Sequence, residues 1–346
     1  MSGLPHPEST PSHRVAPARA VAEAVSAARR IVLTTHVNAD GDGIGSEVAL
    51  IHLLRGQGKR IAAANPTAIP ERYTFLFDGI EAQDRTADAV AALREADLLL
   101  VLDISDLGRL GHLAETIRSL GVTTACVDHH LSPGALPAGP RLVDAAASAT
   151  GELIYDLAVV ADWPVSLEVA RSLYVAMLTD TGGFRFGNTT PAILRRAASL
   201  LEVGIHPERV YEQVYATAPV GRIRLTAEVL DTLEVEPELG LSWVSVPEGA
   251  MERNGVTADD LDGLVEFARS VQGTRLAMLF RRLANHRVKV SFRSVGDFDV
   301  ATFAQQFGGG GHAKASGASI AGDMDEVRAR VLDAARAVLA RPRASD

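Results

Sequence analysis

The sequence contains little cysteine and few aromatic residues, and each shortage excludes a class of protein. Cys126 is the one cysteine among 346 residues, so an intramolecular disulfide is impossible and we expect a reducing, cytoplasmic location. Cys126 lies in an apolar run, where we expect it to be a small buried hydrophobe. Aromatic residues make up only 5% of the chain, which argues against stacking of an extended single strand of nucleic acid on aromatic rings.

An excess of positive charge and a long apolar segment are also missing. The formal net charge is −9, so we do not expect broad electrostatic binding to long nucleic acid, whereas a small phosphorylated substrate remains compatible. No apolar stretch approaches the roughly 20 uncharged residues that span a bilayer, and the amino-terminal residues lack a basic-then-apolar signal pattern. With 47% apolar residues, the chain is predicted to be globular and to have no membrane association.

The length of the chain and its hydrophobic pattern predict two domains. In the first half, apolar strand-like runs alternate with helical stretches, which predicts an α/β fold with a mainly parallel sheet covered by helices. After Pro219, a helix, a hairpin at 275–293 and a closing helix at 323–339 predict a smaller α+β domain. The expected boundaries are a disordered tail at 1–18, a first domain at 19–215, a connecting helix and linker at 216–239, and a second domain at 240–346.

Six histidine and aspartate residues lie at the ends of four apolar runs, each of which we predict to be a β-strand. The runs are 31–37, 98–102, 122–127 and 173–178. The six residues are His36, Asp40, Asp42, Asp103, His129 and Asp180. Binding sites of open α/β sheets lie beyond the carboxyl ends of the strands, so we expect these side chains to converge. Imidazoles and carboxylates without thiolates suit Mn²⁺ or Mg²⁺. The pattern predicts a two-metal hydrolase acting on phosphate esters.

Each motif taken alone also has a purely structural interpretation. Asp40 and Asp42 are each followed by glycine and can serve a turn, Asp103 can cap a helix, and Asp180 can lie in a solvated loop. The triplet Asp128-His129-His130 is harder to explain in this way, because two adjacent imidazoles beside a carboxylate make a poor core. All the structural interpretations have to hold at once, so we favour the metal site.

Four segments resemble, in order, the amino-terminal motifs of the DHH phosphoesterases. They are THVNADGDGIGSE, VLDISD, VDHH and TDTGGFRF. The later segments VKVSFRS and FGGGGHAKASGA are similar to the DHHA1 substrate domain that accompanies one branch of this family. Length, layout and the glycine-rich segment resemble most the NrnA type, which removes nucleotides from very short RNA and dephosphorylates 3′-phosphoadenosine 5′-phosphate (pAp). The resemblance implies an active site in the cleft between the two domains.

The resemblance also implies roles for the six candidate ligands. It assigns His36 and Asp40 to one Mn²⁺ and makes Asp103 a bridge between two such ions, with Mg²⁺ as a possible substitute. The implied ligands of the other ion are Asp42, His129 and Asp180. His130 is implied to be catalytic, in contact with the scissile phosphate, and Asp128 is then expected to orient His129.

The predicted substrate-binding residues lie mainly in the second domain. Four consecutive glycines leave backbone N–H groups free for an anion-binding nest, and the forked guanidinium of Arg293 suits a phosphate. The alternative is a flexible hinge followed by a surface histidine, but the resemblance favours binding of the nucleotide portion that is remote from the metals. Arg185 is a further candidate phosphate contact. The set is Arg185, Arg293, Gly309, Gly310, Gly311 and His312.

Two other functions stay open. The same residues would serve a phosphodiesterase for dinucleotides such as c-di-AMP and pApA. A long-strand exonuclease resembling RecJ fits less well, because the chain is short and acidic. The alternative of another class is a catalytically silent nucleotide-binding regulator, which a missing ligand would favour, yet all six positions are filled. The sequence leaves the oligomeric state open, a homodimer included.

Overall fold

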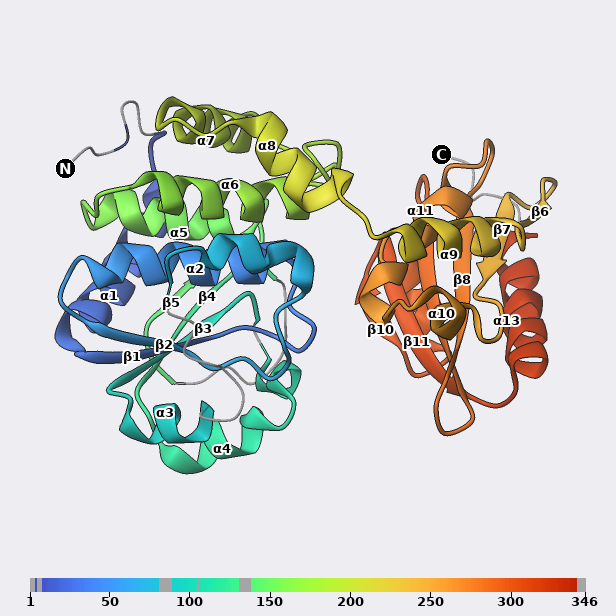
Figure 1. Ribbon diagram of the computed structural model, residues 1–346, viewed down its shortest axis with the longest axis horizontal. Helices are drawn as coiled ribbons and strands as arrows, with labels where there is room; N and C mark the ends of the chain where they lie inside the picture. Colours follow the sequence, from blue (N-terminus) through green and yellow to red (C-terminus); the bar gives the residue numbers. More distant parts are fainter. Residues whose placement is uncertain (1–3, 5–7, 81–88, 105, 131–137, 341–346) are drawn as a thin grey trace. The chain divides into compact units, whose positions relative to one another are not determined.

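The chain folds into two compact units, Met1–Thr217 and Ala218–Asp346. The computed structural model (Figure 1) describes residues 4, 8–80, 89–104, 106–130 and 138–340. Within these residues, no helix has both the length and the apolar composition needed to cross a membrane.

The first unit is built on a five-stranded parallel sheet with the strand order β2-β1-β3-β4-β5. The strands are β1 (Arg30–Thr34), β2 (Arg60–Ala63), β3 (Leu98–Leu102), β4 (Thr124–Asp128) and β5 (Arg141–Val143). Every residue of β3 and β4 is buried. Continuous burial of this kind is typical of a parallel sheet covered on both faces. The predicted fold class is thus confirmed.

Helices cover both faces of this sheet (Figure 1). Successive strand residues point to opposite faces, so Leu98, Leu100 and Leu102 join the core beneath α1, α2 and α5, whereas Leu99 and Val101 pack against α3 and α4. The helices α6 and α7 lie outside the helices α1, α2 and α5. The helices are α1 (Ser12–Ala27), α2 (Gly41–Arg55), α3 (Ala89–Glu95), α4 (Leu113–Leu120), α5 (Thr150–Val160), α6 (Leu167–Asp180), α7 (Pro191–Glu202) and α8 (Pro207–Tyr211). Short 3₁₀ turns at Glu71–Phe77 and Leu107–Leu110 and a π-helical turn at Glu212–Ala216 complete the unit.

The fourth apolar run was predicted to be a strand, and this prediction is wrong. Residues 173–178 lie in α6, which begins after Ser166, whose hydroxyl accepts a hydrogen bond from the backbone N–H of Val169. All six residues of the run are buried, so the run carries no amphipathic period that would distinguish a helix from a strand. Asp180 therefore approaches the sheet from the end of a helix.

The predicted tail at 1–18 is wrong in its extent, because α1 begins at Ser12. Arg14 lies in its first turn, is only 4% exposed, and contacts Glu152 at 2.7 Å and Asp156 at 2.8 Å. Because Glu152 and Asp156 are far from Arg14 along the chain, no local sequence pattern indicates these ion pairs. The short edge strand β5 was not predicted either.

The second unit contains a six-stranded mixed sheet with the order β10-β11-β9-β8-β7-β6, in which only the pair β7–β8 is parallel. The strands are β6 (Glu234–Glu236), β7 (Leu241–Ser245), β8 (Leu276–Leu283), β9 (Arg287–Ser294), β10 (Gly310–His312) and β11 (Ala315–Ala321). The helices are α9 (Val220–Leu230), α10 (Ala250–Asn254), α11 (Leu264–Arg269), α12 (Val300–Gln305) and α13 (Met324–Leu339), with a 3₁₀ turn at Ala258–Leu261. The predicted hairpin at 275–293 and the smaller α+β architecture are confirmed.

The expected linker at 216–239 belongs instead to this second unit. Leu225 and Val229 of α9 are fully buried and pack with Val244 and Leu279 of the sheet. The residues 234–236, expected to be linker, form β6 and pair with β7. The second domain was expected to begin at residue 240, which is too late in the chain. The helix α9 was interpreted as a connection, although one of its faces is buried in the second unit.

Candidate metal centre

The six predicted ligands converge beyond the carboxyl ends of β1, β3 and β4. Asp40 is the N-cap of α2, where its Oδ1 atom accepts hydrogen bonds from the backbone N–H groups of Asp42 and Gly43 at 3.0 and 3.2 Å. This cap places Asp42 in the first turn of α2. Asp103 follows β3 in a left-handed backbone conformation, with φ of 61°, which aspartate adopts more readily than most residues. The turn directs its carboxylate into the cluster.

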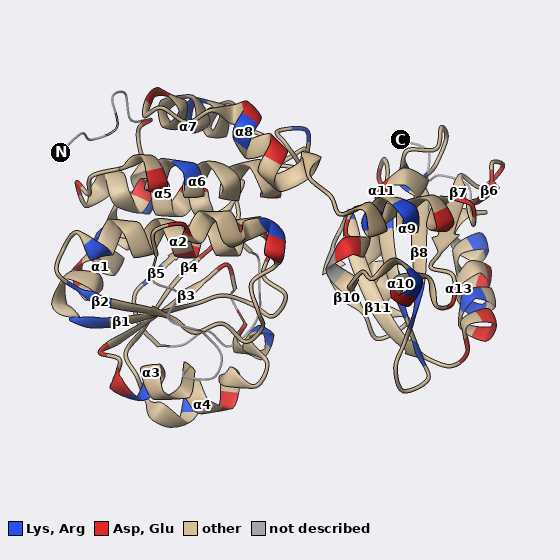
Figure 2. Ribbon diagram, viewed as in Figure 1, with Lys and Arg blue, Asp and Glu red and all other residues tan. Residues whose placement is uncertain are grey.

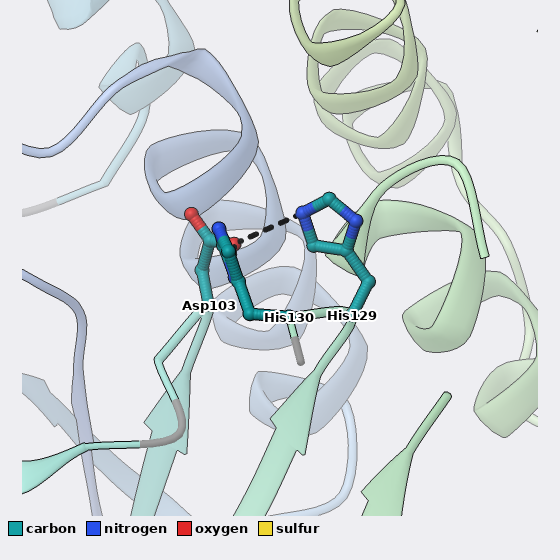
Figure 3. Close-up of side chains that lie close together, drawn as sticks. All are labelled: Asp103, His129 and His130. Atoms are coloured by element: carbon teal, nitrogen blue, oxygen red, sulfur yellow. Dashed lines mark ion pairs between the residues drawn. The ribbon is translucent and has the colours of Figure 1, made fainter. Parts of the chain in front are cut away.

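Asp103 lies between the two candidate histidine ligands. Its Oδ2 atom is 3.3 Å from Nε2 of His36, and its Oδ1 atom is 3.6 Å from Nε2 of His129. Figure 3 shows His129 directed toward this carboxylate. A carboxylate whose two oxygens face different ligand groups has the arrangement that a bridge between two ions requires.

The other ligands divide between these two histidines. Ligand atoms of His36, Asp40 and Asp103 lie within 4.8 Å of one another. A second set with the same spacing is Asp42, His129 and Asp180. Asp42 and Asp103 are 1% and 2% exposed at their side chains, whereas Asp40 is 52% and Asp180 27% exposed. The cluster is thus buried at Asp42 and Asp103 and open to solvent at Asp40 and Asp180, where a substrate can approach.

The two histidines present an unpaired nitrogen to the cluster. In His36 the Nδ1 atom lies 2.9 Å from the carbonyl oxygen of Val37, and in His129 it lies 3.3 Å from that of Ala147. A carbonyl accepts only, so each Nδ1 carries a proton, and in the neutral imidazole that binds a metal the lone pair is on Nε2. Both Nε2 atoms are buried and have no hydrogen-bond partner among the described residues. Two buried ring nitrogens without a hydrogen-bond partner that face carboxylates fit divalent cations between them.

The closely spaced carboxylates of the cluster also favour the binding of a cation. Burial and the carboxylates of Asp40 and Asp103 raise the pKa of Asp180 to about 8. Burial and Asp103 likewise raise the pKa of Asp42 above its ordinary range. Burial lowers the pKa of His36, but Asp103 and Asp40 outweigh this effect and raise it to about 10. Carboxylates packed this closely retain protons unless another positive charge neutralises them, and a bound divalent ion provides that charge.

His130 occupies a different position from His129. Its Nδ1 atom lies 2.7 Å from Oδ1 of Asp128, which is completely buried. The expectation that Asp128 orients His129 is therefore wrong. Alternate residues of an extended chain point to the same side, so Asp128 pairs with His130, and the carbonyl of Ala147 holds His129. His130 also belongs to a third close group with Asp103 and His129 (Figure 3), but its Nδ1 atom is already engaged by Asp128.

Comparison with known proteins identifies the family. Residues 30–177 match the DHH family, N-terminal domain, and residues 244–341 match the DHHA1 domain. A curated relative from Thermus thermophilus is 34% identical over 93% of this chain and 94% of its own length. The chain belongs to the DHH/DHHA1 phosphoesterase family. The first unit is accordingly called the DHH unit and the second the DHHA1 unit.

Other relatives cover similar lengths. The Thermus thermophilus protein carries the name bifunctional oligoribonuclease and PAP phosphatase NrnA, and so does a protein from Bacillus subtilis, which is 30% identical over 84% of this chain and 89% of its own length. The crystal structure of an exopolyphosphatase-related protein from Bacteroides fragilis has a TM-score of 0.86 and 28% identity, covering 94% of this chain and 98% of that one. Family membership makes the protein a hydrolase of phosphate esters whose acidic and histidine clusters fit divalent metal.

The candidate phosphate ligand Arg293 of the DHHA1 unit has an acidic partner that was not predicted. Its Nε atom donates to Oε1 of Glu266 in α11 at 2.8 Å, and the side chain is 28% exposed. Glu266 also pairs with Arg269 at 2.5 Å. No sequence pattern connects Glu266 with Arg293, because α11 and β9 meet only in the folded unit.

The glycine-rich segment is ordered by hydrogen bonds and is not a hinge. The N–H groups of Gly308 and Gly309 donate to the carbonyls of Gln305 and Ala304 at 3.0 Å each, so the expectation that they are free for an anion-binding nest is wrong. Gly310–His312 is β10 and pairs with β11, where His312 lies opposite Ala315 and Ala315 lies opposite Arg293. A Cβ atom at Gly309 would lie 2.2 Å from the carbonyl oxygen of Gly317, so close approach of the two chains explains this glycine. Residues 312 and 293 thus occupy one row across three strands.

Arg185 lies in the turn that follows α6. Its side chain is exposed, and its Nε atom donates to the carbonyl oxygen of Gly182 at 2.6 Å. This bond holds the guanidinium against the turn after Asp180.

Proposed function

We propose that this protein is a two-metal phosphoesterase that hydrolyses short oligoribonucleotides to mononucleotides and removes the 3′-phosphate of pAp. Mn²⁺ is the proposed ion, with Mg²⁺ as a substitute. The observation that carries the proposal is the division of the cluster around Asp103, whose two oxygens face the orphaned Nε2 atoms of His36 and His129. The names of the relatives from Thermus thermophilus and Bacillus subtilis support the substrate class.

The proposed ligand sets follow the two groups of the cluster. His36 and Asp40 would hold one ion, and Asp103 would be shared. The proposed ligands of the other ion are Asp42, His129 and Asp180. Two divalent ions held by these residues would neutralise charge on the phosphate oxygens and lower the pKa of water at the site.

His130 is proposed to act on the phosphate rather than on an ion. Its Nδ1 atom is held by Asp128, and its Nε2 atom is the proposed contact to the phosphate. Burial lowers the pKa of His130, but the hydrogen bond to Asp128 and the charge of Asp103 outweigh this effect and raise it above its ordinary value. A protonated His130 donates from Nε2 to a phosphate oxygen, and this bond strengthens as charge develops during the reaction.

Binding of the rest of the substrate is assigned to the DHHA1 unit. We propose that Arg293 exchanges part of its contact with Glu266 for a phosphate of the substrate. Backbone N–H groups of the glycines and His312, which lie in the same region of the sheet, would bind that end of the substrate. The glycines with this role are Gly310 and Gly311, whereas Gly309, whose N–H donates to the carbonyl of Ala304 at 3.0 Å, would contact the substrate only through the close approach of its backbone. Arg185 is proposed as a phosphate contact beside the metal centre.

The alternatives differ in substrate or in class. A phosphodiesterase for c-di-AMP or pApA would use the same centre, so only a comparison of substrates distinguishes it. Degradation of long strands is disfavoured by the net charge of −9, and Figure 2 shows basic and acidic residues interspersed along helices such as α13. A silent regulator is disfavoured because all six ligand positions hold a residue able to bind a cation.

The test compares substrates with the metal-stripped and reloaded protein. We expect hydrolysis to require added Mn²⁺ and kcat/KM to be greatest for pAp and for di- to pentaribonucleotides. A 24-mer and c-di-AMP serve as the comparison substrates. A preference for c-di-AMP would replace the proposed substrate, and hydrolysis that persists without any divalent ion would refute the two-metal centre.

A further inference from the structure

One short buried segment contacts ligands from both halves of the candidate metal centre. The segment Ala147–Gly151 connects β5 to the first turn of α5, and each of its five residues is buried. The backbone N–H of Thr150 donates to Oδ2 of Asp42 at 2.6 Å, and that of Gly151 donates to Oδ1 at 2.9 Å. Asp42 therefore has both oxygens bound at the amino end of α5, where the helix dipole favours a negative charge.

The side chain of Thr150 contacts the shared ligand as well. Its Oγ1 atom donates to Oδ1 of Asp103 at 3.0 Å, the same oxygen that faces Nε2 of His129. Thr150 is completely buried, so water does not replace this donor if the hydroxyl is removed. One residue thus fixes two carboxylates that come from α2 and from the end of β3.

The same segment also restrains the remaining ligands of the second group. The carbonyl of Ala147 accepts from Nδ1 of His129. The hydroxyl of Ser148 donates to the carbonyl of Asn188 at 2.6 Å, and the amide of Asn188 donates to the carbonyls of Ser148 and Asp180 at 3.0 and 3.2 Å. Through Asn188 the segment reaches the end of α6.

The segment is itself anchored from behind. Glu152 accepts from the backbone N–H of Ser148 at 2.8 Å through Oε2, and its Oε1 atom lies 2.7 Å from Nη1 of Arg14 and 3.6 Å from Nη1 of Arg196. A carboxylate fixed by two buried guanidiniums holds the segment rigidly, and rigid neighbours are what keep metal ligands in place.

We propose that Ala147–Gly151 is the positioning segment of the metal centre and that Thr150 is its principal positioning residue, setting the orientation of Asp42 and Asp103 together. The inference rests on the proposed two-metal function. It adds a residue that is not a ligand but controls the affinity for the ions.

Substitution of Thr150 separates its hydroxyl from the rest of the segment. Thr150→Val keeps the shape and the backbone N–H bond to Asp42, but it removes the donor to Asp103. Loss of such a partner typically weakens metal binding by about 10–100-fold, and we expect a change of this size for Mn²⁺. Thr150→Ser keeps the hydroxyl and should restore affinity to within about threefold of wild type. Thr150→Ala also removes the hydroxyl, and its smaller side chain fits the site more easily than valine. It replaces the valine variant in the experiment if that variant does not fold.

The experiment titrates Mn²⁺ into the metal-stripped full-length protein by calorimetry, with circular dichroism and thermal unfolding as checks of the fold. The matched control is Thr124→Val, because Thr124 is 4% exposed and donates to the carbonyl of Val122 at 3.0 Å, away from every candidate ligand. We expect the control to lose stability and to keep the wild-type affinity for Mn²⁺.

Three results would count against the inference. Wild-type affinity in folded Thr150→Val or Thr150→Ala overturns it and leaves the metal centre intact. A serine variant as weak as the valine variant assigns the effect to packing rather than to the hydroxyl. Absence of Mn²⁺ binding by the wild-type protein overturns the proposed metal centre and this inference with it.

Discussion

The imidazole of His130 is bonded through Nδ1 to Oδ1 of Asp128 at 2.7 Å, and this carboxylate has no exposed surface. The same Nδ1 atom lies 3.6 Å from Oδ1 of Asp103, so His130 meets the cluster through a nitrogen that Asp128 already binds. His129, the adjacent residue, has the opposite arrangement, with a buried and unpartnered Nε2. The proposal accordingly gives the two neighbouring histidines different roles, with His129 as a metal ligand and His130 as a contact to the phosphate.

Replacement of these two histidines should separate the tasks. We expect His130→Ala to lower kcat strongly, by about 100-fold or more if it stabilises charge in the transition state, while Mn²⁺ content stays near that of wild type. His129→Ala should instead lose metal. Elemental analysis of both purified variants decides between the roles, and metal loss in His130→Ala alone would show that they are reversed.

Asp103 should be the least dispensable of the candidate ligands. Asp103→Ala removes the carboxylate that faces both histidines, so neither ion would keep its full ligand set, and we expect turnover to be abolished in a folded protein. The measurement is kcat at saturating Mn²⁺, with circular dichroism to verify the fold. Activity above about a tenth of wild type, equivalent to less than 1.4 kcal/mol in the barrier, would contradict the bridging role.

Arg293 should affect short nucleotide substrates more than a minimal diester. We expect Arg293→Ala to raise KM for a diribonucleotide, because a contact that is equal in ground and transition states acts on KM. Bis-p-nitrophenyl phosphate, which has no nucleotide portion, should be hydrolysed almost as before. His312→Ala is expected to behave in the same way.

Glu266→Gln provides the matched control for Arg293. It removes the charge that competes for the guanidinium and keeps the size of the side chain, so KM for the diribonucleotide should stay the same or fall. Equal losses on both substrates in the Arg293 variant would assign the residue to the chemistry or to the fold.

The ion pairs of α1 should make the stability of the DHH unit depend on pH. Burial alone would raise the pKa of Asp144, but bonds from His13, the N–H of Ala146 and Arg14 lower it from 3.8 to about 2. A carboxyl with a lowered folded-state pKa stabilises the protein above its unfolded pKa, and this contribution is lost as the pH falls through the folded value. Asp144→Asn should therefore lower Tm at pH 7, and the difference from wild type should shrink between pH 4 and pH 2. A difference that is independent of pH would exclude ionisation of Asp144 as its source.

The sequence predicted those features that lie in one short stretch of chain. Apolar runs of strand length that end in aspartate or histidine placed β1, β3 and β4 and the ligands that follow them, since parallel strands bring their carboxyl ends to one edge. The helical state of residues 173–178 was missed, because a helix buried on all sides has no polar face. Asp180 was still placed correctly at the end of its element.

Features that depend on distant partners had no sequence signal. Thr150 contacts Asp42 and Asp103 across intervals of 108 and 47 residues, and nothing in the segment around it resembles a metal motif. Glu266 and Arg14 were missed for the same reason. Asp128 was assigned to the wrong histidine although the alternation of side chains along an extended chain favoured His130.

The buried contacts of Arg14 bear on how this protein should be produced. A gene shortened to begin at residue 19, the domain boundary that the sequence suggested, would delete Arg14. Among the described residues, Arg196 would then be the one remaining ion-pair partner of Glu152 and Asp156. Removing one partner from a buried ionic network typically costs about 3–5 kcal/mol, a large part of the stability of an ordinary domain. If the shortened protein were inactive or aggregated, the loss of Arg14 would explain this result. Such a result would say nothing about the activity of the full-length enzyme.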